Sequence, residues 1–261
     1  MRARLYQPAG RMTNSGAALA VRQQLQRALD HIQSDTVILL VMSGRLGRLR
    51  TWCGVVGPVA FTGAWIVSGH LQRDYSIWNE HVSGLAAPDA RAPFVMAGGF
   101  AVLGLCTVAF ADELHRRLGG REGAGYGPSL MAGAGLSVVL AALLRRDRMT
   151  NRLPGETEPY QQSLVNDGHD YASMTGQACG LLSMVALSRR FGTDPSWGPL
   201  RWPALTAAAV SGGLSVYFSA ETGRPGNGVV QRAGITAALA AMAALAVRML
   251  RAPLAMPPPG P

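Results

Sequence analysis

Three residues whose types could perform acid–base chemistry stand at the ends of long apolar runs. Asp147 comes just after one run, His169 opens another, and Glu221 follows a third. Carboxylates and imidazoles bind zinc or act as general acid and base. HExxH, HxxxH and HxxEH motifs are absent, so we predict no metal site and assign no cofactor. We take the three residues as candidates for catalysis, with structural ion pairing and loop anchoring as the alternative.

A second group of residues could bind a ligand, and Arg232 is the most informative of them. It lies about a turn inside an apolar run, where a charge usually finds a partner or a polar cavity. Its expected partners are Asp147, Glu221 or a ligand anion, and the alternative is snorkelling to the nearby interface. The other predicted ligand-binding residues lie in the loop between the first two runs: Glu80, His81 and Ser83.

Six apolar runs must position these residues. Most of the runs approach the roughly 20 residues that cross the hydrocarbon core, and they lack the period-2 alternation of barrel strands. Because only helices and closed barrels satisfy the backbone in lipid, we predict an all-α bundle of six transmembrane helices. The predicted spans are 51–70, 92–114, 124–144, 169–188, 202–220 and 229–248.

The two ends of the chain differ from this membrane domain, which we place at 42–251. Residues 1–41 are polar and rich in arginine and glutamine, and Met42 begins a basic stretch of the kind that precedes a first transmembrane helix. We therefore interpret 1–41 as an N-terminal extension and Met42 as an alternative start. Residues 252–261 are rich in proline, and we expect a disordered tail.

The net charge of +9 comes from arginine alone, in a chain that is 48% hydrophobic and 15% charged. These arginines stand between the apolar runs, where the positive-inside rule places them, which argues against a nucleic-acid partner. Their distribution favours a multi-pass protein of the cell membrane with both termini in the cytoplasm. The candidate site residues then share the outer face. The three cysteines are widely spaced without a CxxC pair, so we expect them to pack between helices.

The segment HVSGLAAPDARAPFVMAGGF, residues 81–100, resembles the signature of domain-of-unknown-function family 998. The family's first outer loop carries an Ile/Val-Ser-x-Leu motif, and its second helix starts with an aromatic-x-Met motif. An aspartate after the third helix, a histidine opening the fourth and a Gly-x-x-Gln/Glu-Arg start of the sixth are weaker features. The matching residues are Val82, Ser83, Leu85, Phe94, Met96, Asp147, His169, Gly228, Gln231 and Arg232.

The resemblance covers roughly 50–250 and implies a six-helix membrane fold, with no established activity. One departure is that Arg145 and Arg146 replace the family's usual Phe-Pro before the aspartate. Three function classes stay open. The first is a binding or structural membrane protein with an outward-facing polar pocket, covered by the first outer loop as a lid. The second is a membrane enzyme acting on a lipid or isoprenoid, by hydrolysis or terpene-cyclase-like acid–base chemistry. The third is a small-molecule transporter, ranked last because midspan charges are absent.

Overall fold

The structure is a computed structural model of the 261-residue chain, and it describes residues 44–73, 75–119, 125–150, 161–220 and 224–251. The chain divides into two compact units, Met1–Leu46 and Gly47–Pro261, and all contacts below lie within the second. The predicted N-terminal extension, the tail and Glu221 fall outside the described residues.

The described residues form six α-helices and no strand, which confirms the all-α prediction. The α-helices are Gly44–Leu71, α2 (Pro93–Leu118), α3 (Tyr126–Leu143), α4 (Leu164–Phe191), α5 (Arg201–Ala220) and α6 (Asn227–Arg251). Two short 3-10 helices, η1 (Val82–Ala86) and η2 (Gly198–Leu200), lie in loops. Pro93 occupies the first turn of α2, where its missing N–H costs no hydrogen bond.

Four helices are long and apolar enough to cross a membrane, which indicates a multi-pass membrane protein. They are Gly44–Leu71, α2, α3 and α6. The remaining two, α4 and α5, carry more polar side chains. The Gln177 amide of α4 donates to the Ser211 and Ser215 hydroxyls of α5, at 3.1 and 2.9 Å, so polar groups on these two helices satisfy one another.

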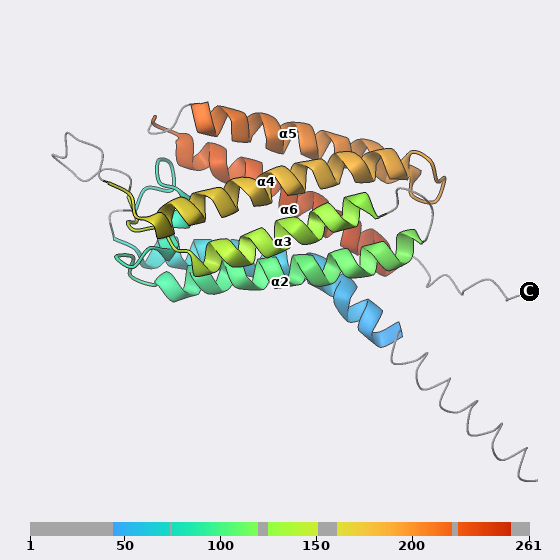
Figure 1. Ribbon diagram of the computed structural model, residues 1–261, viewed down its shortest axis with the longest axis horizontal. Coiled ribbons are helices and arrows are strands. Elements are labelled where there is room, and N and C mark those ends of the chain that lie inside the picture. Colours follow the sequence, from blue (N-terminus) through green and yellow to red (C-terminus); the bar gives the residue numbers. More distant parts are fainter. Residues whose placement is uncertain (1–43, 74, 120–124, 151–160, 221–223, 252–261) are drawn as a thin grey trace, which may run out of the picture. The chain divides into compact units, whose positions relative to one another are not determined.

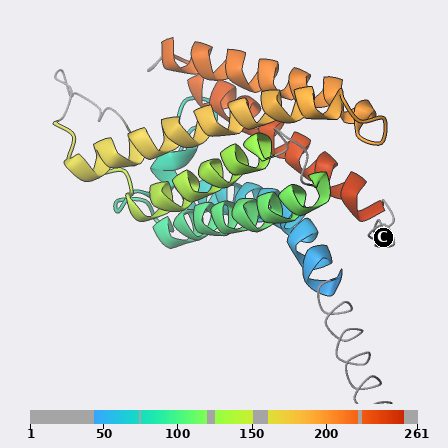
Figure 2. The same cartoon turned by 45° about the vertical axis from the view of Figure 1, so that its right-hand side comes forward.

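Consecutive helices run in opposite directions and pack side by side from α2 to α6 (Figures 1 and 2). The contact between α2 and α3 is a backbone contact. A Cβ built on Gly104 would lie 2.6 Å from the Gly135 carbonyl oxygen, and one on Gly135 would lie 2.7 Å from the Gly104 oxygen. Only glycine permits this approach, which agrees with the role of small residues in membrane helix packing.

The two ends of the bundle are built differently. At one end α2, α4 and α6 begin, and the loop after the first helix covers them (Figure 1). At the other end Arg117 is the main polar link. Its guanidinium bonds the Glu113 carboxylate at 2.8 Å, the Met249 carbonyl at 2.7 Å and the Thr51 hydroxyl at 3.2 Å. One side chain thereby joins the first helix, α2 and α6.

Candidate functional site

The loop from residue 75 to 92, which we term the cap, closes one end of the bundle. Its η1 segment is apolar apart from Ser83, and Val82, Leu85 and Ala86 are at most 1% exposed. Burial of these side chains against the helix ends holds the cap down by the hydrophobic effect. Ser83 is partly buried in η1, and its hydroxyl makes no hydrogen bond with the described residues. The end of the bundle that carries the cap is called the capped end below.

Hydrogen bonds tie the cap to the start of α6. The Val229 N–H donates to the Trp78 carbonyl at 3.2 Å, and the Val82 N–H donates to the Gln231 side chain at 2.8 Å. The two backbones also touch, because a Cβ on Gly228 would lie 2.6 Å from the Glu80 carbonyl oxygen. The predicted loop over the helix ends is therefore held against α6 by main-chain contacts.

Arg232 is the strongest link between the cap and α6. Its Nη1 donates to three carbonyl oxygens, of Ile77 at 2.9 Å, Glu80 at 2.8 Å and Gly228 at 2.8 Å. Its Nη2 donates to the Tyr75 hydroxyl, and the guanidinium lies 5.3 Å from the centroid of the Trp65 ring. The side chain is 7% exposed.

Asp147, one of the partners expected for Arg232, is not among these contacts. No carboxylate of the described residues lies within ion-pairing distance of its guanidinium, and the bonds go to backbone oxygens instead of Asp147. The reason is geometric. Residues 77–80 turn their carbonyls toward α6, and a planar guanidinium can serve several acceptors at once.

A second buried arginine, Arg146, lies beneath the cap. It is 5% exposed, its Nη1 donates to His81 Nδ1 at 3.1 Å, and its Nε lies 3.9 Å from an Asp170 carboxylate oxygen. Because a guanidinium can only donate, Nδ1 of His81 accepts and the neutral ring carries its proton on Nε2. The His81 ring also packs 4.8 Å from the Phe218 ring, centroid to centroid.

The cap residues Glu80 and His81 have pKa values shifted in opposite directions. Burial, together with the charges of Arg146 and Arg232, lowers the pKa of His81 to about 4. Burial also raises the pKa of Glu80, although the same two arginines oppose that shift. In both residues the cost of desolvating a charge favours the neutral form.

His169 is buried to 1% exposure and serves the end of α3. Its Nδ1 lies 2.9 Å from the Ala141 carbonyl and 2.7 Å from the Leu144 carbonyl. Both partners are acceptors, so Nδ1 carries the proton and satisfies carbonyls that a helix end leaves without an intrahelical donor. The other ring nitrogen, Nε2, is buried and has no hydrogen-bond partner among the residues that the structure describes.

Asp147 fixes the start of α4. Its carboxylate accepts from the Ser163 backbone at 2.8 Å and from the Ser163 hydroxyl at 2.5 Å, and these bonds lower the pKa of Asp147. Ser163 is the N-cap of α4 and accepts from the Asn166 N–H. Asp147 is therefore an ionised anchor for the loop between α3 and α4.

The structure thus separates the predicted site residues into two sets. Glu80, His81 and Arg232 meet at the junction of the cap and α6. Asp147 and His169 each bond other groups, and Glu221 lies outside the described residues. Arg146 and Tyr75 complete the cluster and were not selected from sequence. For Arg146 a signal existed, because it replaces an apolar position of the resembled family.

One buried polar atom without a hydrogen-bond partner in the described residues, Nε of Arg190, lies at the end opposite the cap, and four more such atoms lie at the capped end. They come from three helices: Ser68 Oγ of the first helix, His169 Nε2 of α4, and Asn227 Oδ1 and Arg232 Nε of α6. Each side chain is at most 7% exposed. Buried polar groups are nearly always hydrogen-bonded in native proteins, so such atoms indicate water or a ligand.

Comparisons with known proteins agree with this architecture. Residues 55–248 match the family described as "Protein of unknown function (DUF998)". A search of curated proteins and a search of solved structures each gave no match. The matched region covers α2 to α5 in full, the first helix from residue 55 on and α6 up to residue 248, and it includes the cap and every element that contributes to the cluster beneath it. The chain therefore belongs to the DUF998 family.

Proposed function

We propose that this protein is a cell-membrane protein that binds the polar head of an amphipathic ligand, a lipid or an isoprenoid, beneath the cap. All six helices cross the membrane in this proposal, with both termini in the cytoplasm and the cap facing outward. The arginine distribution supports this orientation, because the end opposite the cap carries arginines with few acids beside them.

The observation that carries the proposal is the group of buried polar atoms without partners. An unsatisfied buried donor or acceptor costs about 1–3 kcal/mol, so several of them at one end favour an occupant. Arg232 Nε and the Ser68 hydroxyl can donate, whereas His169 Nε2 and Asn227 Oδ1 accept. A head group with both hydroxyl donors and oxygen acceptors would satisfy this set.

A serine-to-alanine exchange tests the proposal by the sign of its effect. In a dry site Ser68→Ala removes a hydroxyl that makes no hydrogen bond, so the apparent melting temperature rises. In an occupied site the same change removes a hydrogen bond and the melting temperature falls, which we expect. Ser183→Ala is the matched control, because the buried Ser183 hydroxyl donates to the Gly127 carbonyl at 2.8 Å and its loss lowers stability in either case.

Native mass spectrometry distinguishes a ligand from ordered water. Protein extracted in mild detergent should carry a small-molecule adduct, and Ser68→Ala should reduce its occupancy relative to Ser183→Ala. A protein that releases no adduct, together with a melting temperature raised by Ser68→Ala, would refute binding at the capped end.

The orientation is tested by labelling single cysteines in intact cells. Trp78→Cys places a thiol on the cap, where Trp78 is 61% exposed, and an impermeant maleimide should label it directly. Arg248→Cys places a thiol at the opposite end of α6, in an exposed position, and should react only after permeabilisation. The reverse pattern would invert the topology.

A second candidate is an enzyme that acts on the same ligand class, and the opposed pKa shifts of Glu80 and His81 favour it. A carboxylic acid that stays protonated at higher pH can donate a proton, as the general acid of a hydrolase or cyclase does. Lipid profiles of a deletion strain and a Glu80→Gln strain should then show the same accumulated substrate. A deletion profile identical to that of the parent excludes this candidate.

A further inference from the structure

The first helix and α2 pack against each other through small residues. A Cβ built on Gly57 would lie 2.9 Å from the Cys106 Cβ, and one built on Gly99 would lie 2.4 Å from the Ala64 Cβ. The pairs follow one another in opposite directions along the two helices, so the helices are antiparallel. Because glycine allows the two backbones to approach closely, side chains that face this interface are held in contact with one another.

Two thiols meet in this interface. A hydrogen bond joins the thiol of Cys53, on the first helix, and the thiol of Cys106, on α2. Both side chains are partly buried and neither is in a disulfide bond. The third cysteine, Cys179 of α4, lies elsewhere, since its Sγ is 3.6 Å from the position of a Cβ on Gly133 of α3. The chain thus contains one pair of facing thiols and one separate thiol.

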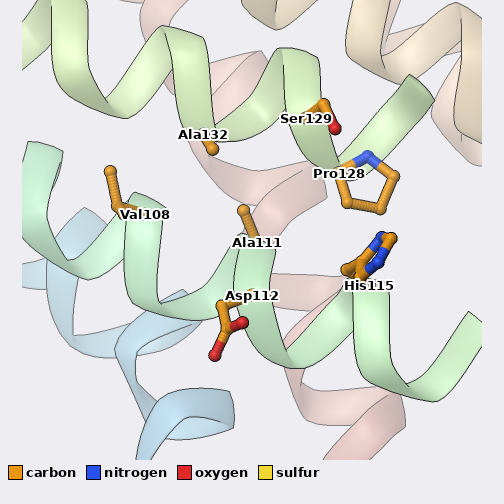
Figure 3. A pocket seen from close by; sticks show the side chains of 7 residues that line it. All are labelled: Val108, Ala111, Asp112, His115, Pro128, Ser129 and Ala132. Atoms are coloured by element: carbon orange, nitrogen blue, oxygen red, sulfur yellow. The ribbon is translucent and has the colours of Figure 1, made fainter. Parts of the chain in front are cut away.

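A group with net positive charge lies about one turn from Cys53. Arg50 is three residues before Cys53 and therefore shares its face of the first helix. Asp112 Oδ2 accepts from Arg50 Nε and from Arg116 Nε, each at 3.2 Å, so two guanidinium groups share one carboxylate. Figure 3 shows a pocket of about 240 Å³ between α2 and α3, and in it the Asp112 carboxylate points away from Ser129 of α3. The charged group therefore belongs to the interface of α2 with the first helix.

We propose that Cys53 and Cys106 form a two-coordinate site for a soft monovalent cation, Cu(I). Soft thiolate ligands select Cu(I). A metal ion deprotonates a coordinating thiol outright, so apolar surroundings that disfavour a free thiolate do not prevent ligation. Each sulfur forms one bond to the ion, the two thiol protons pass to solvent, and no electron is transferred. The S–Cu–S unit carries one negative charge, which the positive group at Arg50 offsets.

Other uses of two facing thiols fit less well. A structural zinc site takes four ligands, and the described part of the chain contains no group of three His, Cys, Asp or Glu side chains that could hold a metal. A disulfide would require the sulfurs to approach to about 2.05 Å. A two-coordinate ion holds them roughly 4–5 Å apart, twice a metal–sulfur bond, which is closer to the separation of two thiols in contact. The site does not involve the cap and does not depend on binding beneath it.

Copper binding to the purified full-length protein tests this proposal. The protein is reduced with a phosphine and titrated with Cu(I) in the absence of oxygen, in competition with a chromogenic Cu(I) chelator, and native mass spectrometry counts the bound ions. We expect one Cu(I) per chain, with a mass increase of one copper less two protons. The bound ion should also raise the melting temperature. Zn(II) should bind much more weakly in the same titration.

Cysteine variants identify the ligands. Cys53→Ser and Cys106→Ser should each weaken Cu(I) binding at least a hundredfold, because loss of even an outer-shell partner costs a metal site about 10–100-fold in affinity. Cys179→Ser is the matched control and should bind Cu(I) as the parent does. Cys53→Ala and Cys106→Ala repeat the test without placing a hydroxyl among apolar groups, and the melting temperature without copper shows which variants are folded. A parent that retains no copper, equal binding by all variants, loss of binding in Cys179→Ser, or zinc binding as tight as that of copper would overturn the proposal.

Discussion

Replacing Arg232 by alanine should release the cap from α6. The Arg232 guanidinium donates hydrogen bonds to the Ile77 and Glu80 carbonyls of the cap, and it also donates to the Gly228 carbonyl and the Tyr75 hydroxyl. A hydrogen bond to a charged donor contributes about 1.5–3 kcal/mol. Loss of the hydrogen bonds to the two cap carbonyls therefore removes roughly 3–6 kcal/mol of stabilisation. This loss is partly offset, because alanine does not carry the cost of desolvating a buried guanidinium.

We expect a net loss of about 3 kcal/mol in the free energy that keeps the cap closed. Since 1.4 kcal/mol corresponds to a factor of ten, the amides that cross the junction should exchange their hydrogens at least a hundredfold faster. The reporters are the N–H groups of Val82 and Val229, which bond Gln231 and Trp78 across the junction.

Hydrogen exchange followed by mass spectrometry in nanodiscs measures this effect. Arg232→Lys should give an intermediate result, because an ammonium keeps the charge but cannot reach the same set of acceptors in a plane. Arg248→Ala is the control on the same helix, since Arg248 is exposed and, within the described part of the chain, makes one hydrogen bond, to the Ser196 carbonyl at 3.3 Å. Unchanged exchange at the junction in Arg232→Ala would refute the view that this side chain holds the cap.

Three further outcomes follow from the contacts. Arg117→Ala should lower the free energy of unfolding by about 3–5 kcal/mol, because it leaves the Glu113 carboxylate buried without its partner. Arg116 is exposed, so Arg116→Ala should lower the free energy of unfolding by less than about 1 kcal/mol. Chemical unfolding in detergent compares the two variants. Gly228→Ala should open the cap, since its Cβ would lie 2.6 Å from a cap carbonyl, and proteolysis of the cap measures the opening. The pKa of His81 is lowered to about 4, so the neutral ring stabilises the fold above about pH 6.5 and this contribution is lost as the pH falls toward 4. The loss reaches roughly 2 kcal/mol at pH 5. The difference in melting temperature between the parent and His81→Gln should shrink over that range, and a constant difference would contradict this prediction.

The helices could be predicted from sequence because the length of each apolar run largely determines them. An apolar run of about 20 residues has few alternatives to a buried or membrane helix, and each predicted span falls on one helix of the structure. The bounds differ at the ends. For example, α4 begins at Leu164, ahead of the apolar run, because Ser163 caps it and Asp147 anchors Ser163. Polar turns of this kind lie outside the apolar runs, so the apolar runs do not predict them.

The roles of the polar residues could be predicted only in part. Arg232 was identified because a charge inside an apolar run is costly wherever the chain folds. His169 and Asp147 have residue types suited to catalysis, but their partners are the end of α3 and the N-cap of α4. Those partners come from the way neighbouring helix ends meet, which residue type and spacing do not specify. Arg146 is buried by the cap, so its importance appears only once the cap is in place.

The two ends of the bundle use arginine in the same way. Arg232 bonds cap carbonyls at one end, and Arg117 bonds the Met249 carbonyl and the Thr51 hydroxyl at the other. Helices in lipid gain little from apolar contact with one another, so directional bonds at their ends carry more of the specificity. A guanidinium suits this task because its donors diverge in one plane and reach acceptors on several elements. The hydrogen bonds that arginine makes at each end therefore also determine which polar atoms there have no partner. At the capped end, the atoms left over among the described residues are Ser68 Oγ, His169 Nε2, Asn227 Oδ1 and Arg232 Nε, and the binding that we propose beneath the cap rests on them.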